Sequence, residues 1–151
     1  MASDEFPDSL ADVLAGVQRL IRRRLRGGTA TPRLRGAQAE LLRLVVTRPG
    51  IRVSAAAKEL YLAGNSVSTL VNQLTRAGYL RRETAPDDRR SGLLFPTSEA
   101  RARLRDWDAR RSALVHEQVA RLAEADRAAL AAALPALRRL AHQLHEEADG
   151  T

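Results

Sequence analysis

The order of hydrophobic patterns between residues 34 and 97 restricts the fold of this chain more than any other feature. Apolar residues recur there at helical spacing in three successive segments, and two short runs with strand character follow. A turn-forming segment, 85–92, separates those two runs and is expected to be too long for a tight turn. The pattern therefore predicts helices over 34–47, 54–60 and 65–77 and strands over 79–84 and 93–95.

Start and stop signals support this order of elements. Ser54 offers an N-cap for the short helix, and residues 61–64 form a break before the third helix. Gly78 follows the third helix in the left-handed cap position, and Thr97 starts the next helix. A helix, a short helix, a turn, a further helix and a hairpin together make a winged helix-turn-helix. The expected fold class is mainly α with a small β-hairpin wing.

Long amphipathic segments flank this core on both sides. Gly27 and Gly28 are expected to end the first of these helices, and Pro135 should kink the last one. The flanking helices are predicted over 8–26, 98–122 and 125–147. They cannot all bury their apolar stripes in a small winged domain, so they predict a homodimer that covers the excess. The residues expected at that interface include Leu10, Val13, Leu14, Val17, Leu130, Leu134, Leu137 and Leu144.

Length, composition and charge agree with a single DNA-binding domain. The 151 residues fit one domain, with a core over 34–97 and dimerisation helices over 8–26 and 98–147. Ala and Leu dominate while aromatics are only 3%, which argues against a β-sandwich or barrel. The formal net charge is +7, and Lys58 is the only lysine. A coding bias explains the excess of arginine over lysine equally well, but the positive balance favours an anionic partner, nucleic acid first.

Several function classes are disfavoured by what the sequence lacks. Without cysteine the chain has no disulfide, thiolate nucleophile or Cys-ligated zinc. No apolar run is long enough to span a membrane, and the acidic start MASDEFPDSL lacks a secretory signal, so we expect a cytoplasmic protein. Neither a glycine-rich phosphate loop nor a catalytic Ser-His-Asp set nor a paired-carboxylate site stands out. We therefore expect neither an enzyme nor a cofactor.

The histidines and the basic segment 19–26 suggest two other functions. His142 and His145 lie three residues apart beside Glu146, but structural zinc needs four ligands, and a solvated helix face explains them better. No metal site is expected. The basic segment could lie on a membrane surface, yet the apolar side of its helix lacks Trp and Phe and is better used for dimerisation.

The third predicted helix has the composition of a recognition helix. Its apolar residues fall on one side, and its other side carries short hydroxyls, amides and one arginine: Asn65, Ser66, Ser68, Thr69, Asn72, Gln73 and Arg76. Amides can make paired hydrogen bonds to adenine, hydroxyls bond many base edges, and arginine binds guanine or phosphate. Plain solvation is the alternative, but solvated faces usually carry Glu and Lys, and no acidic residue lies from Asn65 to Arg82. The pattern favours DNA readout.

The run VSAAAKELYLAGNSVSTLVNQLTRAGYLRRETAPDDRRSGLLFPTSEA resembles the DNA-binding core of the MarR family of bacterial transcription regulators. With the flanking helices, the resemblance covers about residues 10–144. Its most specific part is the wing. The family carries Asp-any-Arg there, followed by a Leu-Thr pair, and this chain has Asp88-Arg89-Arg90 before Pro96-Thr97.

The resemblance implies roles for the wing residues. Arg90 would be the wing-tip arginine that reaches into the minor groove, and Asp88 the carboxylate that orients it. The expected DNA-binding set is Ser54, Asn65, Ser66, Ser68, Thr69, Asn72, Gln73, Arg76, Asp88, Arg89 and Arg90. The implied function is a sequence-specific regulator, usually a repressor, that binds a pseudo-palindromic operator as a homodimer. The alternative is a non-specific architectural DNA-binding protein.

The resemblance also implies a small aromatic or lipophilic effector, lodged between the dimer helices and the winged domain. Trp107 is the only large aromatic residue on the helix that follows the wing, which makes it the candidate effector-binding residue. A tryptophan that merely fills an interface is the alternative.

Three residues depart from the family pattern. Pro96 replaces the usual Leu, Ala100 stands where Gly is common, and Tyr61 stands where the turn of a helix-turn-helix often has Gly. The substitution at Tyr61 weakens the prediction of a sharp turn, because glycine adopts left-handed backbone conformations most readily.

Overall fold

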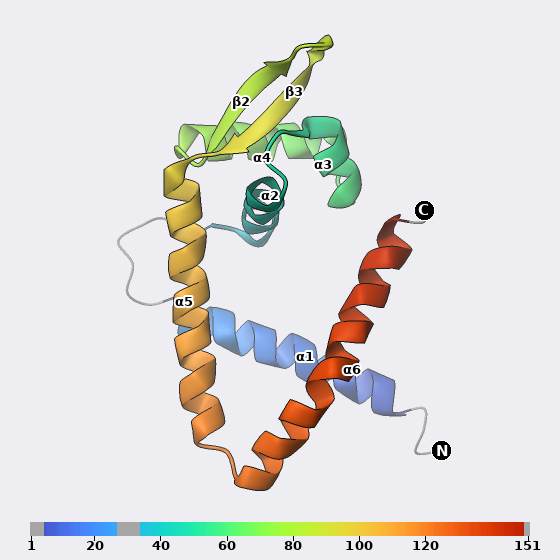
Figure 1. The fold of residues 1–151 in the computed structure, drawn as a ribbon, viewed down its shortest axis with the longest axis vertical. Helices are drawn as coiled ribbons and strands as arrows, with labels where there is room; N and C mark the ends of the chain where they lie inside the picture. The colour runs from blue at the N-terminus through green and yellow to red at the C-terminus, as the bar shows by residue number, and fades with distance from the viewer. Residues whose placement is uncertain (1–4, 27–33, 150–151) are drawn as a thin grey trace.

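The computed structural model describes residues 5–26 and 34–149 of the chain, and Figure 1 shows how its elements are arranged. In chain order they are α1 (Glu5–Arg24), α2 (Gly36–Thr47), β1 (Ile51–Arg52), α3 (Val53–Glu59), α4 (Gly64–Arg76), β2 (Leu80–Ala85), β3 (Asp88–Pro96), α5 (Ser98–Ala120) and α6 (Glu124–Asp149). The protein is mainly helical with one small antiparallel sheet, so the predicted fold class is confirmed. The glycines expected to end the first helix lie outside the described residues.

The core of the winged part forms where α2, α3, α4 and the sheet meet. It consists of small and branched aliphatic side chains that exclude water almost completely. The largest of them, each less than 2% exposed, are Leu41, Leu42, Val45, Val67, Val71, Leu74 and Leu94. Three of these come from α4, which confirms that the apolar side of the predicted third helix faces the core.

The sheet has a third strand that the sequence did not indicate. β1 is only two residues long and pairs with β3 through Ile51↔Leu94 and Arg52↔Leu93, which gives the strand order β1-β3-β2. Two residues are too few for an alternating pattern to be visible, so β1 could be found only through its partner strand.

The hairpin is longer and its turn is tighter than predicted. β2 ends at Ala85 and β3 begins at Asp88, so Pro86 and Asp87 alone make the turn. The expectation of a loop too long for a tight turn is therefore wrong. The register shifts between Thr84 and Ala85, and this irregularity takes up the extra residues of β3 that composition had placed in a loop.

The predicted N-cap of the short helix is also wrong. α3 begins at Val53, one residue earlier than expected, and its N-cap position is held by Arg52, which makes no side-chain capping bond. Because Arg52 is the last residue of β1, the extended backbone leads directly into the helix and Ser54 already lies inside it.

Thr97 caps α5 as predicted and also ties this helix to the end of α4. Its hydroxyl oxygen accepts a hydrogen bond from the Ala100 amide at 3.2 Å, and the hydroxyl donates to the carbonyl of Gly78 at 2.7 Å. Gly78 has a φ of 82°, the left-handed conformation expected after a helix. One threonine thus fixes the connection between the winged part and the long helices.

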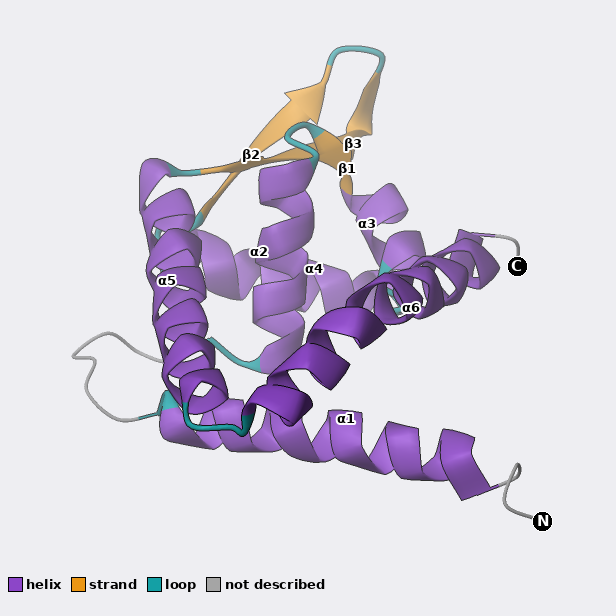
Figure 2. Ribbon diagram, turned by 60° about the horizontal axis from the view of Figure 1, so that its bottom comes forward, coloured by secondary structure: helices purple, strands orange, loops and turns teal. Residues whose placement is uncertain are grey.

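α5 leads away from the winged part, and α6 turns back from the far end of α5 (Figures 1 and 2). At the end of α1, Leu25 is buried and its carbonyl accepts a hydrogen bond from Arg110 of α5 at 3.2 Å. The large apolar side chains that stay exposed on α1 and α6 are Phe6, Val13, Leu14, Val17, Leu20, Leu130, Leu134 and Leu144. Pro135 lies inside α6, and the helix continues through it. No helix in the described ranges is both long and apolar enough to cross a membrane.

Candidate DNA interface and the neighbouring pocket

The polar side of α4 lies at the surface, as the sequence indicated. Six of its seven predicted contact residues are exposed, and Ser68 is half-buried. Beneath them Val67, Val71 and Leu74 pack into the core and fix the rotation of the helix. We call the set Asn65, Ser66, Ser68, Thr69, Asn72, Gln73 and Arg76 the recognition face.

Some polar groups of the recognition face already have partners within the protein. The side-chain oxygen of Asn65 accepts from the Ser66 amide at 2.9 Å, and the Thr69 hydroxyl donates to the Asn65 carbonyl at 3.0 Å. Gln38 of α2 donates from Nε2 to Oε1 of Gln73 at 2.9 Å. The Gln73 amide is therefore oriented by α2, with its own NH₂ group left as the donor for a base.

The wing consists of β2, β3 and their turn, and it carries the three residues that the resemblance singled out. Asp88, Arg89 and Arg90 are all exposed. The Asp88 carboxylate accepts from the backbone amide of Arg90 at 2.9 Å and from the Ser91 hydroxyl at 3.4 Å. Asp88 thus fixes the backbone at Arg90 through its amide, and these hydrogen bonds do not involve the Arg90 guanidinium. Ser54 lies exposed on α3, and nothing in these contacts assigns it to DNA.

An ion pair that sequence reasoning missed ties the wing to the helix-turn-helix. Arg52 donates from Nη2 to both carboxylate oxygens of Asp87, at 2.8 and 2.7 Å. The hydrogen bond to Arg52 is the main reason that the pKa of Asp87 lies below its ordinary value, and Coulombic attraction to the same arginine adds to it. No sequence signal connects two residues so far apart in the chain.

Gly92 leaves room for the guanidinium of another wing arginine, Arg82. A Cβ at this position would come within 2.3 Å of Nε of Arg82, so the absence of a side chain makes room for the guanidinium. On the same strand as Arg82, the Arg81 guanidinium lies 5.0 Å from the centre of the Phe95 ring. Both arginines are exposed, and the Arg81 guanidinium also pairs with the carboxylate of Glu83 on the same strand.

Tyr61 occupies the turn between α3 and α4 with a φ of 53°. It is the only residue other than glycine with a positive φ in the described part of the chain, and its side chain is 63% exposed. The sharp turn therefore forms without the usual glycine, at the cost of a left-handed backbone at a bulky residue.

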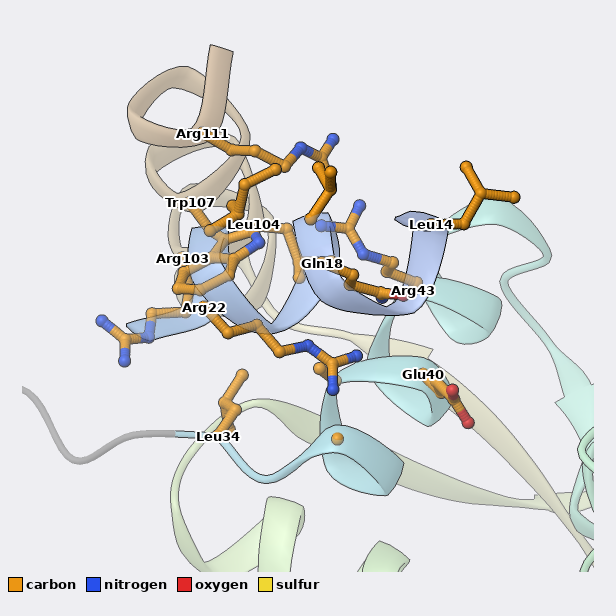
Figure 3. A pocket seen from close by; sticks show the side chains of 14 residues that line it. Leu14, Gln18, Arg22, Leu34, Glu40, Arg43, Arg103, Leu104, Trp107 and Arg111 are labelled. Carbon is orange, nitrogen blue, oxygen red and sulfur yellow. The ribbon is translucent and has the colours of Figure 1, made fainter. Parts of the chain in front are cut away.

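A pocket of about 490 Å³ lies between α1, α2 and α5, and Figure 3 shows its lining. Trp107 of α5 is half-buried and lines it, as do apolar side chains of α1 and four arginines. The lining residues are Leu14, Val17, Gln18, Ile21, Arg22, Leu34, Gly36, Ala39, Glu40, Arg43, Arg103, Leu104, Trp107 and Arg111. An aromatic ring and cationic head groups in one cavity suit a small organic anion.

At the edge of this pocket Asp108 joins two of its arginines. Arg43 of α2 donates two hydrogen bonds to the Asp108 carboxylate, at 2.7 and 3.3 Å, and Arg111 lies 3.2 Å from it. The hydrogen bond from Arg43 is the main reason that the pKa of Asp108 lies below its ordinary value. Partial burial opposes this shift, and attraction to both arginines adds to it. Asp108 itself lines a second cavity, of about 330 Å³.

The histidines near the end of α6 lie on its exposed surface. His142 contacts Glu146 at 3.2 Å, one helical turn away, and both are exposed on α6. Among the described residues no three His, Cys, Asp or Glu side chains come together in a group that could hold a metal ion.

Residues 34–91 match a sequence model of the MarR family. The fold is similar to that of FabT from Streptococcus pneumoniae, solved in complex with DNA, at 23% identity over 93% of this chain and 98% of that one, with a TM-score of 0.69. It is also similar to the Tm0710 transcriptional regulator of Thermotoga maritima, at 23% identity over 95% and 98% of the two chains and a TM-score of 0.69.

A third similar structure is the PcaV transcriptional regulator of Streptomyces coelicolor, solved with its natural ligand. It is 24% identical over 90% of this chain and 92% of that one, with a TM-score of 0.60. No curated protein sequence matches the chain.

Proposed function

We propose that this chain is a cytoplasmic, sequence-specific transcription regulator of the MarR family, whose sequence model matches its winged core, residues 34–91. The observation that carries the proposal is the recognition face, an exposed and acid-free polar surface on α4 beside an arginine-rich wing. Carboxylates would repel the phosphates of DNA, and amides and hydroxyls are the groups that read base edges.

In the proposed complex α4 enters the major groove and the wing follows the backbone into the adjacent minor groove. Asn65, Asn72 and Arg76 contact base edges from α4, and Arg90 enters the minor groove, where a narrow A·T-rich segment concentrates negative potential. The fold's similarity to a regulator solved with DNA supports this arrangement.

The proposed regulator is a homodimer. Exposed apolar side chains on α1 and α6 support this, because monomeric proteins rarely expose so many large aliphatic residues on neighbouring helices. A two-fold dimer would place two copies of α4 about 34 Å apart, one turn of DNA, and would read a pseudo-palindrome. Repression follows if the operator overlaps the path of the polymerase.

A small organic effector bound between α1, α2 and α5 is the proposed signal. The cavity of about 490 Å³ is large enough for one aromatic acid, with Trp107 as an apolar wall and Arg22 as a cation beside it. The ligand in the similar PcaV structure supports an effector in this protein as well.

Footprinting of the DNA that flanks the protein's own gene tests the proposal. We expect protection of an inverted repeat whose half-sites lie about 10 base pairs apart, and resistance of that complex to competition by bulk DNA. Uniform protection, with bulk DNA competing as well as the candidate operator, would instead identify an architectural DNA-binding protein.

A further inference from the structure

Asp108 is placed to compete with a ligand for the arginines of the α1–α2–α5 pocket. Both terminal nitrogens of Arg43 are engaged by its carboxylate, at 2.7 and 3.3 Å, and Arg111 approaches the same carboxylate at 3.2 Å. Arg43 and Arg111 line the large pocket, whereas Asp108 lines the second cavity, to which Arg43 also contributes. Figure 3 shows the two arginine side chains extending toward one another.

The pocket lining carries far more positive than negative charge. It holds Arg22, Arg43, Arg103 and Arg111 against the single carboxylate of Glu40. Asp108 therefore supplies charge compensation from outside the cavity. A bidentate arginine has already committed the two nitrogens that best match a carboxylate, so a second carboxylate can take that geometry only by displacing the first.

We propose that Asp108 is an internal counter-anion, and that the carboxylate of an aromatic acid bound in the pocket displaces it from Arg43 and Arg111. The ring of such a ligand packs on Trp107, and the carboxylate of the ligand binds the guanidinium groups of Arg43 and Arg111. The proposal rests on the proposed function for its output on DNA, but the competition itself is a property of the pocket.

Displacing Asp108 changes how α5 is held against the winged part. Arg43 belongs to α2, inside the winged core, and Asp108 belongs to α5, so their ion pair spans the two parts. At the beginning of α5, Thr97 keeps the helix attached to the end of α4, and Leu104 is buried in the core. The ligand thus releases a contact farther along α5 while these two anchors remain.

The exposure of the ion pair sets the size of the effect. The side chains of Arg43 and Asp108 are 39% and 42% exposed, so water screens them and their attraction is modest. Removing the competing carboxylate should therefore improve ligand binding by about two- to fivefold, which is the range that a partly exposed pair supports.

Fluorescence of Trp107, the only tryptophan, measures this competition without DNA. Benzoate and benzamide are titrated as probes, since they share a shape and differ in charge. We expect benzoate to bind more tightly than benzamide, and Asp108→Asn to strengthen benzoate binding by about two- to fivefold while leaving benzamide unchanged. Asp106→Asn, on the same helix and exposed, is the control for the loss of one negative charge.

Two results would overturn the proposal. One is the absence of a saturable response to benzoate at about 10 mM, a concentration that detects even weak binding. The other is equal strengthening by Asp108→Asn and Asp106→Asn. If Asp108→Asn does not fold by circular dichroism, Arg111→Gln replaces it and should weaken the binding of benzoate but not that of benzamide.

Operator binding then separates this proposal from the proposed function. Benzoate should weaken operator binding by the wild-type protein, and less so by Asp108→Asn, in which the contact is already lost. An operator complex indifferent to benzoate in both proteins would refute the release step alone. A protein that binds benzoate as described but binds no operator would refute the proposed function and leave the competition standing.

Discussion

Tyr61 holds a backbone conformation that bulky residues avoid, and it does so at a surface position. Its side chain is 63% exposed, so little packing energy holds it there. The constraint comes from its neighbours: Leu62 donates a backbone hydrogen bond to Ala57 at 3.0 Å, and only residues 60–63 separate the end of α3 from the start of α4. The strain is local and should be visible in stability.

Replacing Tyr61 by glycine or by alanine measures that strain. With a φ of 53°, glycine at this position should give a free energy of unfolding about 1 kcal/mol higher than alanine. Gly64 is the control, since a Cβ there meets nothing within 4 Å and Gly64→Ala should be neutral or stabilising. Urea denaturation of the variants compares them, and equal stability of Tyr61→Gly and Tyr61→Ala would contradict the interpretation.

Arg90 and Asn65 should affect DNA binding differently. Arg90→Ala should weaken binding to operator and random DNA alike, by about 1–3 kcal/mol, and make the salt dependence shallower by about one unit. Asp88→Ala should act in the same direction but less, because it loosens the Arg90 backbone and keeps the charge. Asn65→Ala should cost more on the operator than on random DNA.

Titrations against both DNAs at two salt concentrations test this pattern. Arg121→Ala serves as the control, since it removes the same charge from an exposed site near the end of α5. A folded Arg90→Ala variant that binds both DNAs like the wild type would show that the wing assignment is wrong.

An exposed ion pair between Arg52 and Asp87 links the turn of the wing to the start of α3. The pKa of Asp87 is lowered from 3.8, chiefly by its hydrogen bond to Arg52. The group therefore favours the folded arrangement at pH values above 3.8, and this contribution is lost as the pH falls through the lowered pKa. The wing should become more mobile under acidic conditions.

Nuclear magnetic resonance relaxation of the backbone at residues 84–90 detects that change. At neutral pH Asp87→Asn should raise the mobility of the turn relative to the wild type, and the two proteins should converge once Asp87 is protonated. Asp126→Asn, at the start of α6, is a charge-matched control. A difference that persists at acidic pH would argue against the ion pair as the cause.

Element types could be read from the sequence wherever a period repeats often enough. The helices, β2 and the second half of β3 follow from the sequence pattern, and the inward side of α4 follows from Val67, Val71 and Leu74. β1 has only two residues, and β3 looked like loop because Asp, Arg, Ser and Gly fill its first half. These strands exist because backbone pairing, not side-chain pattern, satisfies their polar groups.

Contacts between distant residues were beyond sequence reasoning for a different physical reason. Arg43 and Asp108 are 65 positions apart, and the pairs Gln38–Gln73 and Arg52–Asp87 each 35 apart. Every arginine on an exposed helix is an equally plausible partner for a carboxylate until the fold selects one. The recognition face could be predicted from the sequence because all its residues lie on one helix. The charged edge of the pocket could not be predicted, because its residues come from different helices that only the fold brings together.

The proposed reading of a palindromic operator requires that the protein form a dimer. Sedimentation at micromolar concentration should show a dimer. Leu134→Asp, which puts a charge among the exposed aliphatic residues of α6, should shift it to monomer and weaken operator binding. Thr47→Asp, exposed at the end of α2, should leave the dimer intact. A wild-type protein that sediments only as monomer would remove the basis for reading a palindrome.

Thr97 is hydrogen-bonded both to Ala100 of α5 and to Gly78 at the end of α4, so a rotation of α5 would move α4 with it. The 23 residues of α5 span about 34 Å. If α5 pivots at its far end by about 10°, its beginning at Thr97 moves by about 6 Å. That displacement exceeds the reach of any hydrogen bond to a base. In the proposed DNA-bound dimer, a rotation of α5 by a few degrees, transmitted through Thr97, would therefore move an intact α4 out of the spacing that DNA imposes.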